Sequence, residues 1–479
     1  MDASVFQNLP LDLWVKIFQL TREPDGAWFD DENPPDYRWP PSILTAQTPL
    51  LLTLVCKPWR TLARSCADLW TSVKCQISDD TLVVHDSDDE FKGLADYLAC
   101  SGSMSLSLII SFHIQDCERA NNALQLLYPH FGRLSALRVS IGNGVLGELT
   151  PIPRVAMPHC QLIQVNFWQD KYTKWLAPLM TNELLKLHAL DMREYVSANA
   201  TYLPVEQQLG HLLHLQATAN NFAIRPVDIL RCCERLVTCT LYFRLGPHSG
   251  GKDNTHSPDF IMPYLQSLSI RVKSSYYWRD VFGHATCPSL RRLRLNGTFW
   301  PVPTFAPFLQ RSRCQLQQLT LSGTNISASD LIQALQIAGE TLETLVLGCQ
   351  YINQVPDGSL PCFTDNLLDA LDPVQAGRNV LAPHMHTLQV ECQGPLETTD
   401  GRFIEVVQAR MAHAGRTTGF RHITLTCGSE ELQKPHFHQK DMEGVALLPE
   451  QHPGVSVRVY PDPRERDDGT DAEEGGGSG

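Results

Sequence analysis

Apolar positions along the chain form a short pattern, apolar-x-x-apolar-x-apolar, that returns about every 25 residues. The middle residues of its nine consecutive copies are Leu137, Val165, Leu190, Leu215, Cys239, Leu268, Leu293, Leu319 and Leu345. Two later copies, centred on Leu388 and Ile423, follow longer intervals of 43 and 35 residues. The last residues of each copy alternate apolar and polar, which predicts a short strand with one buried face. A period of this length indicates a repeat architecture.

Helical signals fill the intervals between these predicted strands. Ser327 provides an N-cap and Gly339 a stop for a helix of the intervening residues. Further helices are expected at residues 226–236, 365–371 and 403–414. A strand that pairs in parallel with the next must return by a crossover, which is usually a helix. The sequence therefore predicts an α/β fold of strand, turn, helix, turn units, with parallel strands inside and helices outside.

The L-x-x-L-x-L cores resemble those of the leucine-rich repeat family over residues 103–460. The resemblance implies an irregular leucine-rich-repeat solenoid. The family usually has Asn or Cys three residues after the last strand leucine, whereas this chain has Thr298, Thr324 and Gln350, so we expect uneven curvature. A doubly wound sheet shows similar leucine patterns and is the alternative. The regular spacing favours the solenoid, and the sequence has no G-x-G-x-x-G or G-x-x-x-x-G-K-S/T phosphate turn.

Residues 1–76 follow a different pattern, made of two apolar blocks. The first, LPLDLWVKIFQL, begins at Leu9, and the second, LVCKPWRTLA, begins at Leu54 and is followed by an L-W pair at Leu69. Together these blocks resemble the F-box, a small helical module, interrupted here by an insertion at residues 21–48 rich in proline and acid. An insertion of this length costs little loop entropy, so we expect it to bulge outward.

The F-box resemblance implies a partner, the Skp-type adaptor, which joins F-box proteins to the cullin and RING subunits of a ubiquitin ligase. The residues expected to bind the adaptor are Leu9, Pro10, Leu13, Trp14, Ile17, Phe18, Val55, Cys56, Trp59, Leu62, Leu69 and Trp70. An alternative is that Trp14, Trp59 and Trp70 form the core of the module itself or dock onto the first repeat. Residues 77–102 are expected to form an acidic linker and connector helix, as in fungal F-box proteins with degenerate leucine-rich repeats.

The charge of the chain is uneven. With 39 basic and 52 acidic residues the formal net charge is −13. Acids concentrate in residues 23–36, 78–90 and 461–479, and the last of these is expected to be a disordered tail. The rest of the chain is nearly neutral, so the sequence shows no concentration of positive charge that would bind nucleic acid. The N-terminus lacks a signal-peptide pattern and no apolar run could cross a bilayer, so we expect an intracellular protein, cytoplasmic or nuclear.

The sequence contains little evidence of a catalytic site. Histidine pairs at 211/214, 384/386 and 436/438 come without a C-x-x-C or H-E-x-x-H motif, so no metal is expected. Cys232 and Cys233 lie in a predicted helix, where a thiol behaves as a small apolar residue. No G-x-S-x-G elbow occurs. We therefore expect neither an enzyme nor a cofactor.

With little sign of catalysis or metal binding, recognition of another protein is the function that the sequence favours. Residues that alternate with the strand leucines, Gln164 among them, would line the inner face, and Trp, Tyr and Arg are enriched in binding hot spots. The expected substrate-binding residues are Trp168, Tyr242, Arg271, Arg292 and Arg294. The alternative is that the arginines only solvate a strand. The resemblances thus predict a substrate-recognition subunit of an SCF-type E3 ubiquitin ligase, and the alternative is a leucine-rich-repeat interaction scaffold with a drifted F-box.

Overall fold

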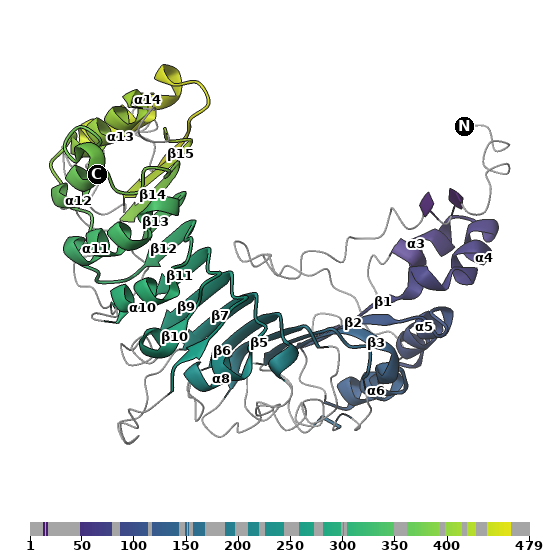
Figure 1. Ribbon diagram of the computed structural model, residues 1–479. Helices are drawn as coiled ribbons and strands as arrows, with labels where there is room; N and C mark the ends of the chain where they lie inside the picture. Colours follow the sequence, from purple (N-terminus) through teal and green to yellow (C-terminus); the bar gives the residue numbers. More distant parts are fainter. Residues whose placement is uncertain are drawn as a thin grey trace, which may run out of the picture. The chain divides into compact units, whose positions relative to one another are not determined.

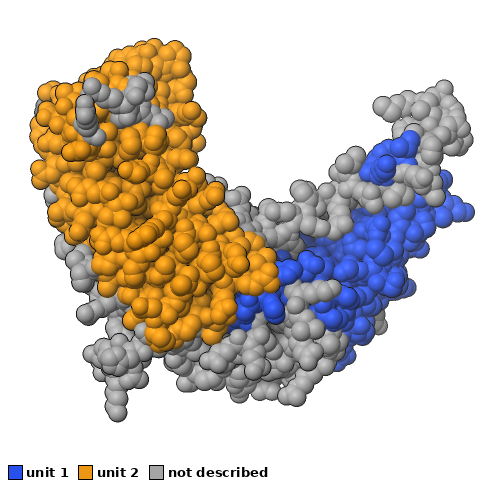
Figure 2. All heavy atoms as spheres, in the orientation of Figure 1, with its two compact units in different colours: residues 1–212, 216–223 blue, residues 213–215, 224–479 orange. Residues whose placement is uncertain are grey.

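The computed structural model of the 479-residue chain describes residues 13–14, 16–17, 48–78, 87–113, 117–142, 149–150, 152, 157–167, 187–196, 209–219, 226–243, 258–272, 281–297, 300, 304–348, 362–392, 398–413, 419–427 and 438–460. These residues fall into two compact units, coloured separately in Figure 2. The first unit contains residues Met1–Leu212 and Gln216–Ala223, and the second contains Leu213–Leu215 and Ile224–Gly479.

The first unit begins with paired helices and continues into a sheet. Its elements are α3 (Thr48–Val55), α4 (Lys57–Ser65), the 3-10 turn η1 (Ala67–Trp70), β1 (Ser72–Ser78), α5 (Ser87–Cys100), β2 (Leu106–His113), α6 (Cys117–Leu127), η3 (Tyr128–Arg133), β3 (Leu134–Ile141), β4 (Leu162–Phe167), β5 (Ala189–Val196) and η5 (Leu209–His211). The strands β1 to β5 pair in parallel in chain order. The next strand, β6 (His214–Ala219), has residues in both units.

The second unit alternates strands with helices (Figure 1). Its strands are β7 (Thr238–Phe243), β8 (Phe260–Ile261), β9 (Ser267–Val272), β10 (Ala285–Thr286), β11 (Arg292–Asn296), β12 (Gln318–Ser322), β13 (Thr344–Gly348), β14 (Thr387–Cys392), β15 (His422–Cys427) and β16 (Ser456–Tyr460). Its helices are α8 (Pro226–Cys232), α10 (Phe305–Ser312), α11 (Ala328–Ala338), α12 (Asp365–Leu371), α13 (Arg402–Ala412) and α14 (Gln439–Gln451), with 3-10 turns η6 (Gly339–Thr341) and η7 (Gly377–Asn379).

The leucine pattern sets the register of this sheet. From β7 to β16 the strands are parallel and follow chain order, apart from β8 and β10, which form a separate pair. One row of aligned residues is Leu268, Leu293, Leu319, Leu345, Leu388, Ile423 and Val457. All of these side chains except that of Val457, on the last strand, are buried. Complete burial of a leucine contributes about 1.5–3 kcal/mol, so this row is a main source of stability.

The prediction of an α/β fold with a large parallel sheet is confirmed. All eleven copies of the apolar pattern coincide with strands, β3 to β7, β9 and β11 to β15. Five other described strands, β1, β2, β8, β10 and β16, lie outside the pattern. Strand β1 spans the boundary that we expected at residue 76, so the segment assigned to an acidic linker begins inside a strand. The expected tail at residues 461–479 lies outside the described residues.

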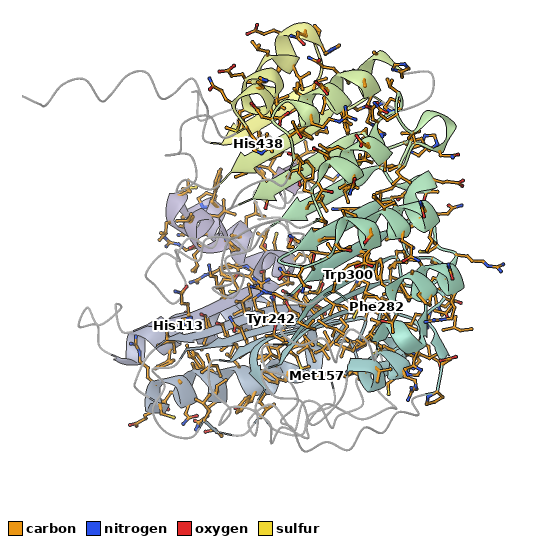
Figure 3. All side chains as sticks on the ribbon, turned by 90° about the vertical axis from the view of Figure 1, so that its left-hand side faces the viewer. His113, Met157, Tyr242, Phe282, Trp300 and His438 are labelled. Carbon is orange, nitrogen blue, oxygen red and sulfur yellow. The ribbon has the colours of Figure 1, made fainter. Side chains whose placement is uncertain are left out.

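Helices α10 to α14 cover one face of the second unit's sheet, and each packs against the next (Figure 1). Aromatic rings fill the space beneath α10. Phe282 lies 4.8 Å from Phe308 and 5.4 Å from Phe305 between ring centroids. Trp300 stacks on Phe305 at 4.6 Å, and Figure 3 labels Phe282 and Trp300. Geometries of this kind add to the free energy gained by burying the rings.

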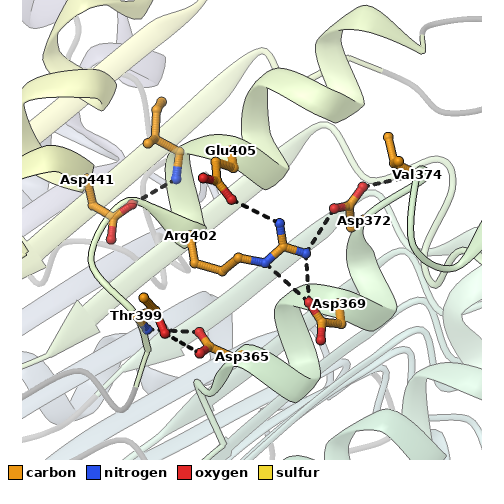
Figure 4. A network of polar contacts seen from close by, with 9 residues as sticks. Asp365, Asp369, Asp372, Val374, Thr399, Arg402, Glu405 and Asp441 are labelled. Atoms are coloured by element: carbon orange, nitrogen blue, oxygen red, sulfur yellow. Dashed lines mark hydrogen bonds and ion pairs between the residues drawn. The ribbon is translucent and has the colours of Figure 1, made fainter.

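Charged contacts join α12 to α13 (Figure 4). Arg402, at the start of α13, donates from Nη2 to Asp369 at 2.7 Å and to Asp372 at 2.9 Å, and from Nη1 to Glu405 at 3.2 Å. Burial acts to lower the pKa of Arg402, but the hydrogen bonds to Asp369, Asp372 and Glu405 outweigh it and raise that pKa. The helix pair is therefore held by a cation that stays charged at any pH at which the protein folds.

Candidate functional site

The sheet face opposite helices α10 to α14 carries three exposed arginines on the adjacent strands β9 and β11. In β11, Leu293 and Leu295 are buried, whereas the arginines that precede each of them, Arg292 and Arg294, are exposed. In the neighbouring strand β9, Arg271 is exposed between two buried residues. Because strand side chains alternate between the two faces, all three arginines lie on the face opposite the helices. We call Arg271, Arg292 and Arg294 the arginine patch.

Register places the patch on adjacent strands. Arg294 lies opposite Ser269 on β9, and Arg271 lies opposite Asn296 on β11. On the other side of β9, Arg271 pairs with Tyr242 of β7, and its guanidinium carbon sits 4.6 Å from the centre of the Tyr242 ring. Tyr242 is labelled in Figure 3. This cation–π contact restricts the side chain of Arg271 while leaving its donors available.

The described neighbours of the patch on the same sheet face are uncharged. Neighbours on the same face are Thr238, Thr240, Ser267, Ser269, Gln318, Thr320 and Ser322. Within the described residues, none of the three arginines forms an ion pair with a carboxylate. The patch is thus a local concentration of positive charge in a protein whose net charge is −13.

The structure brings together four of the five residues expected to bind substrate. Tyr242, Arg271, Arg292 and Arg294 lie on the three neighbouring strands β7, β9 and β11. The fifth, Trp168, lies outside the described residues. Their common face follows directly from strand alternation in repeats that are in phase. The spacing of the repeats in the sequence does not reveal the contact between Arg271 and the Tyr242 ring.

The corresponding positions in the first unit are buried or half-buried. Arg138 Nε donates to Gln164 Oε1, and Gln164 Nε2 donates to Asp191 Oδ2 at 2.8 Å, so the three side chains form a polar row across β3, β4 and β5. Gln164 and Asp191 are buried. We had expected Gln164 on an accessible inner face, and its burial corrects that expectation. This row stabilises the sheet through buried hydrogen bonds.

A second surface lies on the first unit, where α3 and α4 pair. Helix α3 has the sequence TPLLLTLV, and only part of it is covered: Leu52 is buried, whereas Leu54 is 73% and Val55 60% exposed. The exposed large apolar residues here are Leu13, Ile17, Leu51, Leu54 and Val55. A helix apolar on nearly every side cannot bury all of its residues in so small a pair of helices, and such exposed groups mark association surfaces. We call these five residues the apolar surface.

Several residues expected to bind the adaptor lie in the interior. Trp14, Leu69 and Trp70 are buried, and the indole N–H of Trp70 donates to the carbonyl of Ala63 at 2.7 Å. Trp70 also packs edge-on against Tyr97 of α5, with ring centroids 4.8 Å apart. These residues thus support the helices, as the alternative interpretation of the tryptophans anticipated.

The other residues expected to bind the adaptor are either at least partly exposed or outside the described part of the chain. Trp59 is half-buried and packs edge-on against Trp14, with ring centroids 5.2 Å apart. Leu62 is half-buried, and Cys56 is exposed at the N-cap of α4. The expected residues outside the described part of the chain are Leu9, Pro10 and Phe18. Sequence reasoning missed Leu51 and Leu54, although the nearly apolar run of α3, broken only by Thr53 after Pro49, was a usable signal.

Nucleophilic chemistry finds no support in the thiols. Burial raises the pKa of Cys233, Cys160 and Cys287 to about 12 each, and it raises the pKa of Cys239 as well. These thiols stay protonated at neutral pH, and a protonated thiol is a poor nucleophile. Cys232, the other thiol considered from the sequence, is half-buried.

One group of metal-type ligands occurs among the described residues, namely Asp400, His438 and Asp441, with ligand atoms within 4.8 Å of one another. Each is already used in the fold. His438, labelled in Figure 3, lies 3.1 Å from Asp441 through Nδ1. Asp441 accepts the backbone N–H of Ile404 at 2.9 Å, and Asp400 accepts that of Lys440 at 3.0 Å. The group joins the start of α14 to α13, as an arrangement of helix caps does.

A partly open cavity of about 260 Å³ lies beside α10 and α11, on the helical side of the sheet. Its aromatic wall is Trp300 and Phe305, and its charged group is Asp330. Asp330 accepts the Ser327 hydroxyl at 2.7 Å, and its backbone N–H donates to the same hydroxyl at 3.1 Å. The carboxylate is therefore engaged in capping α11.

Comparison with known proteins gives no family. A scan against models of known protein families and a search of curated proteins both returned no match. No described helix is long and apolar enough to cross a membrane.

Proposed function

We propose that this protein is a substrate-recognition subunit of an SCF-type ubiquitin ligase. The apolar surface would bind a Skp-type adaptor and, through it, the cullin and RING subunits, and the sheet of the second unit would bind the substrate protein. The observation that supports the proposal is the exposed apolar surface, because it lies within the segment that resembles an F-box. The chain itself would break no bond and would act by raising the local concentration of substrate near the conjugating enzyme.

Exposure of Leu54 and Val55 allows a direct test. The double variant Leu54→Ala/Val55→Ala removes two side chains that the fold leaves at the surface, so its stability should change little. Loss of a binding hot spot costs about 2 kcal/mol or more, roughly thirtyfold in affinity. We expect the parent chain to co-purify with a Skp-type adaptor and cullin, and the double variant to lose them. Trp59 is a poorer target because its truncation would also remove its packing against Trp14.

A matched control is available in the second unit. Ile261 is 63% and Val374 60% exposed, so Ile261→Ala/Val374→Ala removes a similar apolar area elsewhere. We expect this control to retain the adaptor. A third chain lacking residues 21–48 tests whether the insertion obstructs binding. If neither the parent nor the deleted chain binds the adaptor, the ligase proposal fails and the interaction-scaffold alternative stands in its place.

A further inference from the structure

We propose that the arginine patch binds an extended acidic segment of a partner protein through the carboxylates of its Asp and Glu side chains. The inference rests on the proposed function only in treating that partner as a ligase substrate. The binding chemistry itself depends on Arg271, Arg292 and Arg294 and on their neighbours in β7, β9 and β12.

The sign of the partner's charge follows from the patch. Three exposed guanidinium groups share one face, and their described neighbours are hydroxyl and amide residues. Within the described part of the chain no carboxylate neutralises them. Arginine binds carboxylates through two parallel hydrogen bonds, and this geometry needs one accessible edge of the guanidinium.

The spacing of the arginines favours an extended segment. Arg292 and Arg294 are two residues apart on one strand, about 7 Å. Arg271 lies opposite Asn296, which is two residues beyond Arg294, so the three positions form a line across two strands. An extended peptide presents alternate side chains at the same interval of about 7 Å. A single phosphate, by contrast, requires donors that converge on one point. The surrounding hydroxyls can hydrogen-bond with the backbone of a bound peptide.

Net charge argues against a nucleic acid on this face. Outside its three acidic segments the chain is nearly neutral, so a long polyanion would find little additional positive charge beyond the patch. A short acidic segment contacts the patch alone. At physiological ionic strength the Debye length is about 8 Å, so more distant acids have little influence on it. The face therefore suits a short acidic stretch of protein better than an extended nucleic acid.

The test measures binding of a labelled peptide to the full chain by fluorescence anisotropy, without adaptor. The probe is a dodecapeptide of alternating Glu and Ser, and the matched peptide replaces each Glu by Gln. The patch variant is Arg271→Gln/Arg292→Gln/Arg294→Gln. The control variant, Arg235→Gln/Arg313→Gln/Arg421→Gln, removes the same charge at exposed positions elsewhere in the second unit.

We expect the Glu peptide to bind the parent and the control variant with similar affinity, more tightly at low ionic strength. The patch variant should bind about tenfold more weakly, because each exposed ion pair supplies roughly a factor of two. The Gln peptide should not bind. Equal binding of both peptides, or of parent and patch variant, would overturn the proposal. Tighter, arginine-dependent binding of a single-stranded DNA dodecamer would assign the face to nucleic acid instead.

A further variant addresses the chain's own acidic tail, residues 461–479. If the peptide binds only after this segment is deleted, the occupant of the patch is the tail, and the partner assignment is wrong. Adaptor co-purification by the patch variant separates the two proposals. A patch variant that loses the peptide but keeps the adaptor supports both the ligase proposal and the acidic-partner proposal. A parent chain that binds the adaptor but not the peptide refutes only the acidic-partner proposal.

Discussion

Replacement of Arg410 by methionine should destabilise the second unit strongly. Arg410 lies on α13 with its side chain fully buried, although a helix usually exposes an arginine. Its guanidinium donates to the carbonyls of Leu371 at 3.1 Å, Leu381 at 3.2 Å and Ala382 at 2.6 Å. Burial lowers its pKa to about 10, but it remains protonated at neutral pH. One cation thus donates hydrogen bonds to carbonyls from two separate stretches of chain, the end of α12 and the segment that precedes β14.

The size of the effect follows from these contacts. Ala382 keeps another donor, the N–H of Met385 at 3.0 Å, so Leu371 and Leu381 carry most of the loss. An unsatisfied buried carbonyl costs about 1–3 kcal/mol, and removal of the buried charge recovers part of this. We expect a net loss of about 3 kcal/mol, roughly 6–12 °C in melting temperature for a unit of this size.

Thermal and urea unfolding followed by circular dichroism would measure the change. Arg421→Met, which removes an exposed arginine from the same unit, should alter stability by less than about 0.5 kcal/mol. Arg410→Lys should fall between the parent and Arg410→Met, because a compact ammonium keeps the charge but cannot span all three carbonyls. Equal stability of Arg410→Met and the parent would show that the cost of burying the cation cancels its hydrogen bonds, and would refute this reasoning.

Two further predictions concern stability. Leu345→Ala, in the middle of the aligned leucine row, should lower the unfolding free energy by about 2–5 kcal/mol in urea titrations, and a loss under 1 kcal/mol would show a loosely packed core. Burial and the nearby Arg133 lower the pKa of His130, so the unfolded chain binds the proton more readily. Stability of the first unit should therefore be complete above about pH 6.5 and fall as the pH drops below it. His130→Asn should reduce that slope, and an unchanged slope would contradict the assignment.

The parallel sheet could be predicted from the sequence because its signal is repeated. Each copy of the pattern alone is ambiguous, but equal spacing fixes both strand identity and register, so that Leu293 lies beside Leu268 and Leu319. Local chemistry was equally informative for α11, where the Ser327 hydroxyl accepts the N–H of Asp330 as expected of an N-cap. Strand β1 was missed because its seven residues stand alone, without a matching copy.

Burial at polar positions could not be predicted. The sequence pattern places Val165 in line with Leu137 and Leu190, but in the sheet Ile163 occupies that position. Gln164 and Arg294 therefore each follow the aligned apolar residue of their strand, yet the first is buried and the second exposed. Arg410 is a sharper case, because its partners are backbone carbonyls 28 to 39 residues away, and no side-chain pattern encodes them. Similarly, Trp70 is covered by Tyr97 from a helix that begins well beyond the F-box-like segment. Such contacts depend on how elements meet in space.

The constant register of the second unit has an evolutionary consequence. Spacing between aligned leucines changes from 26 residues, between Leu319 and Leu345, to 43, between Leu345 and Leu388, while the ladder itself stays in phase. Added residues are absorbed in the connections, where extra length costs little. Mutation can therefore lengthen or shorten one connection without disturbing its neighbours. A lineage carrying this architecture could revise the rim of the sheet by insertion and deletion while the strand face, and any partner bound to it, is inherited unchanged.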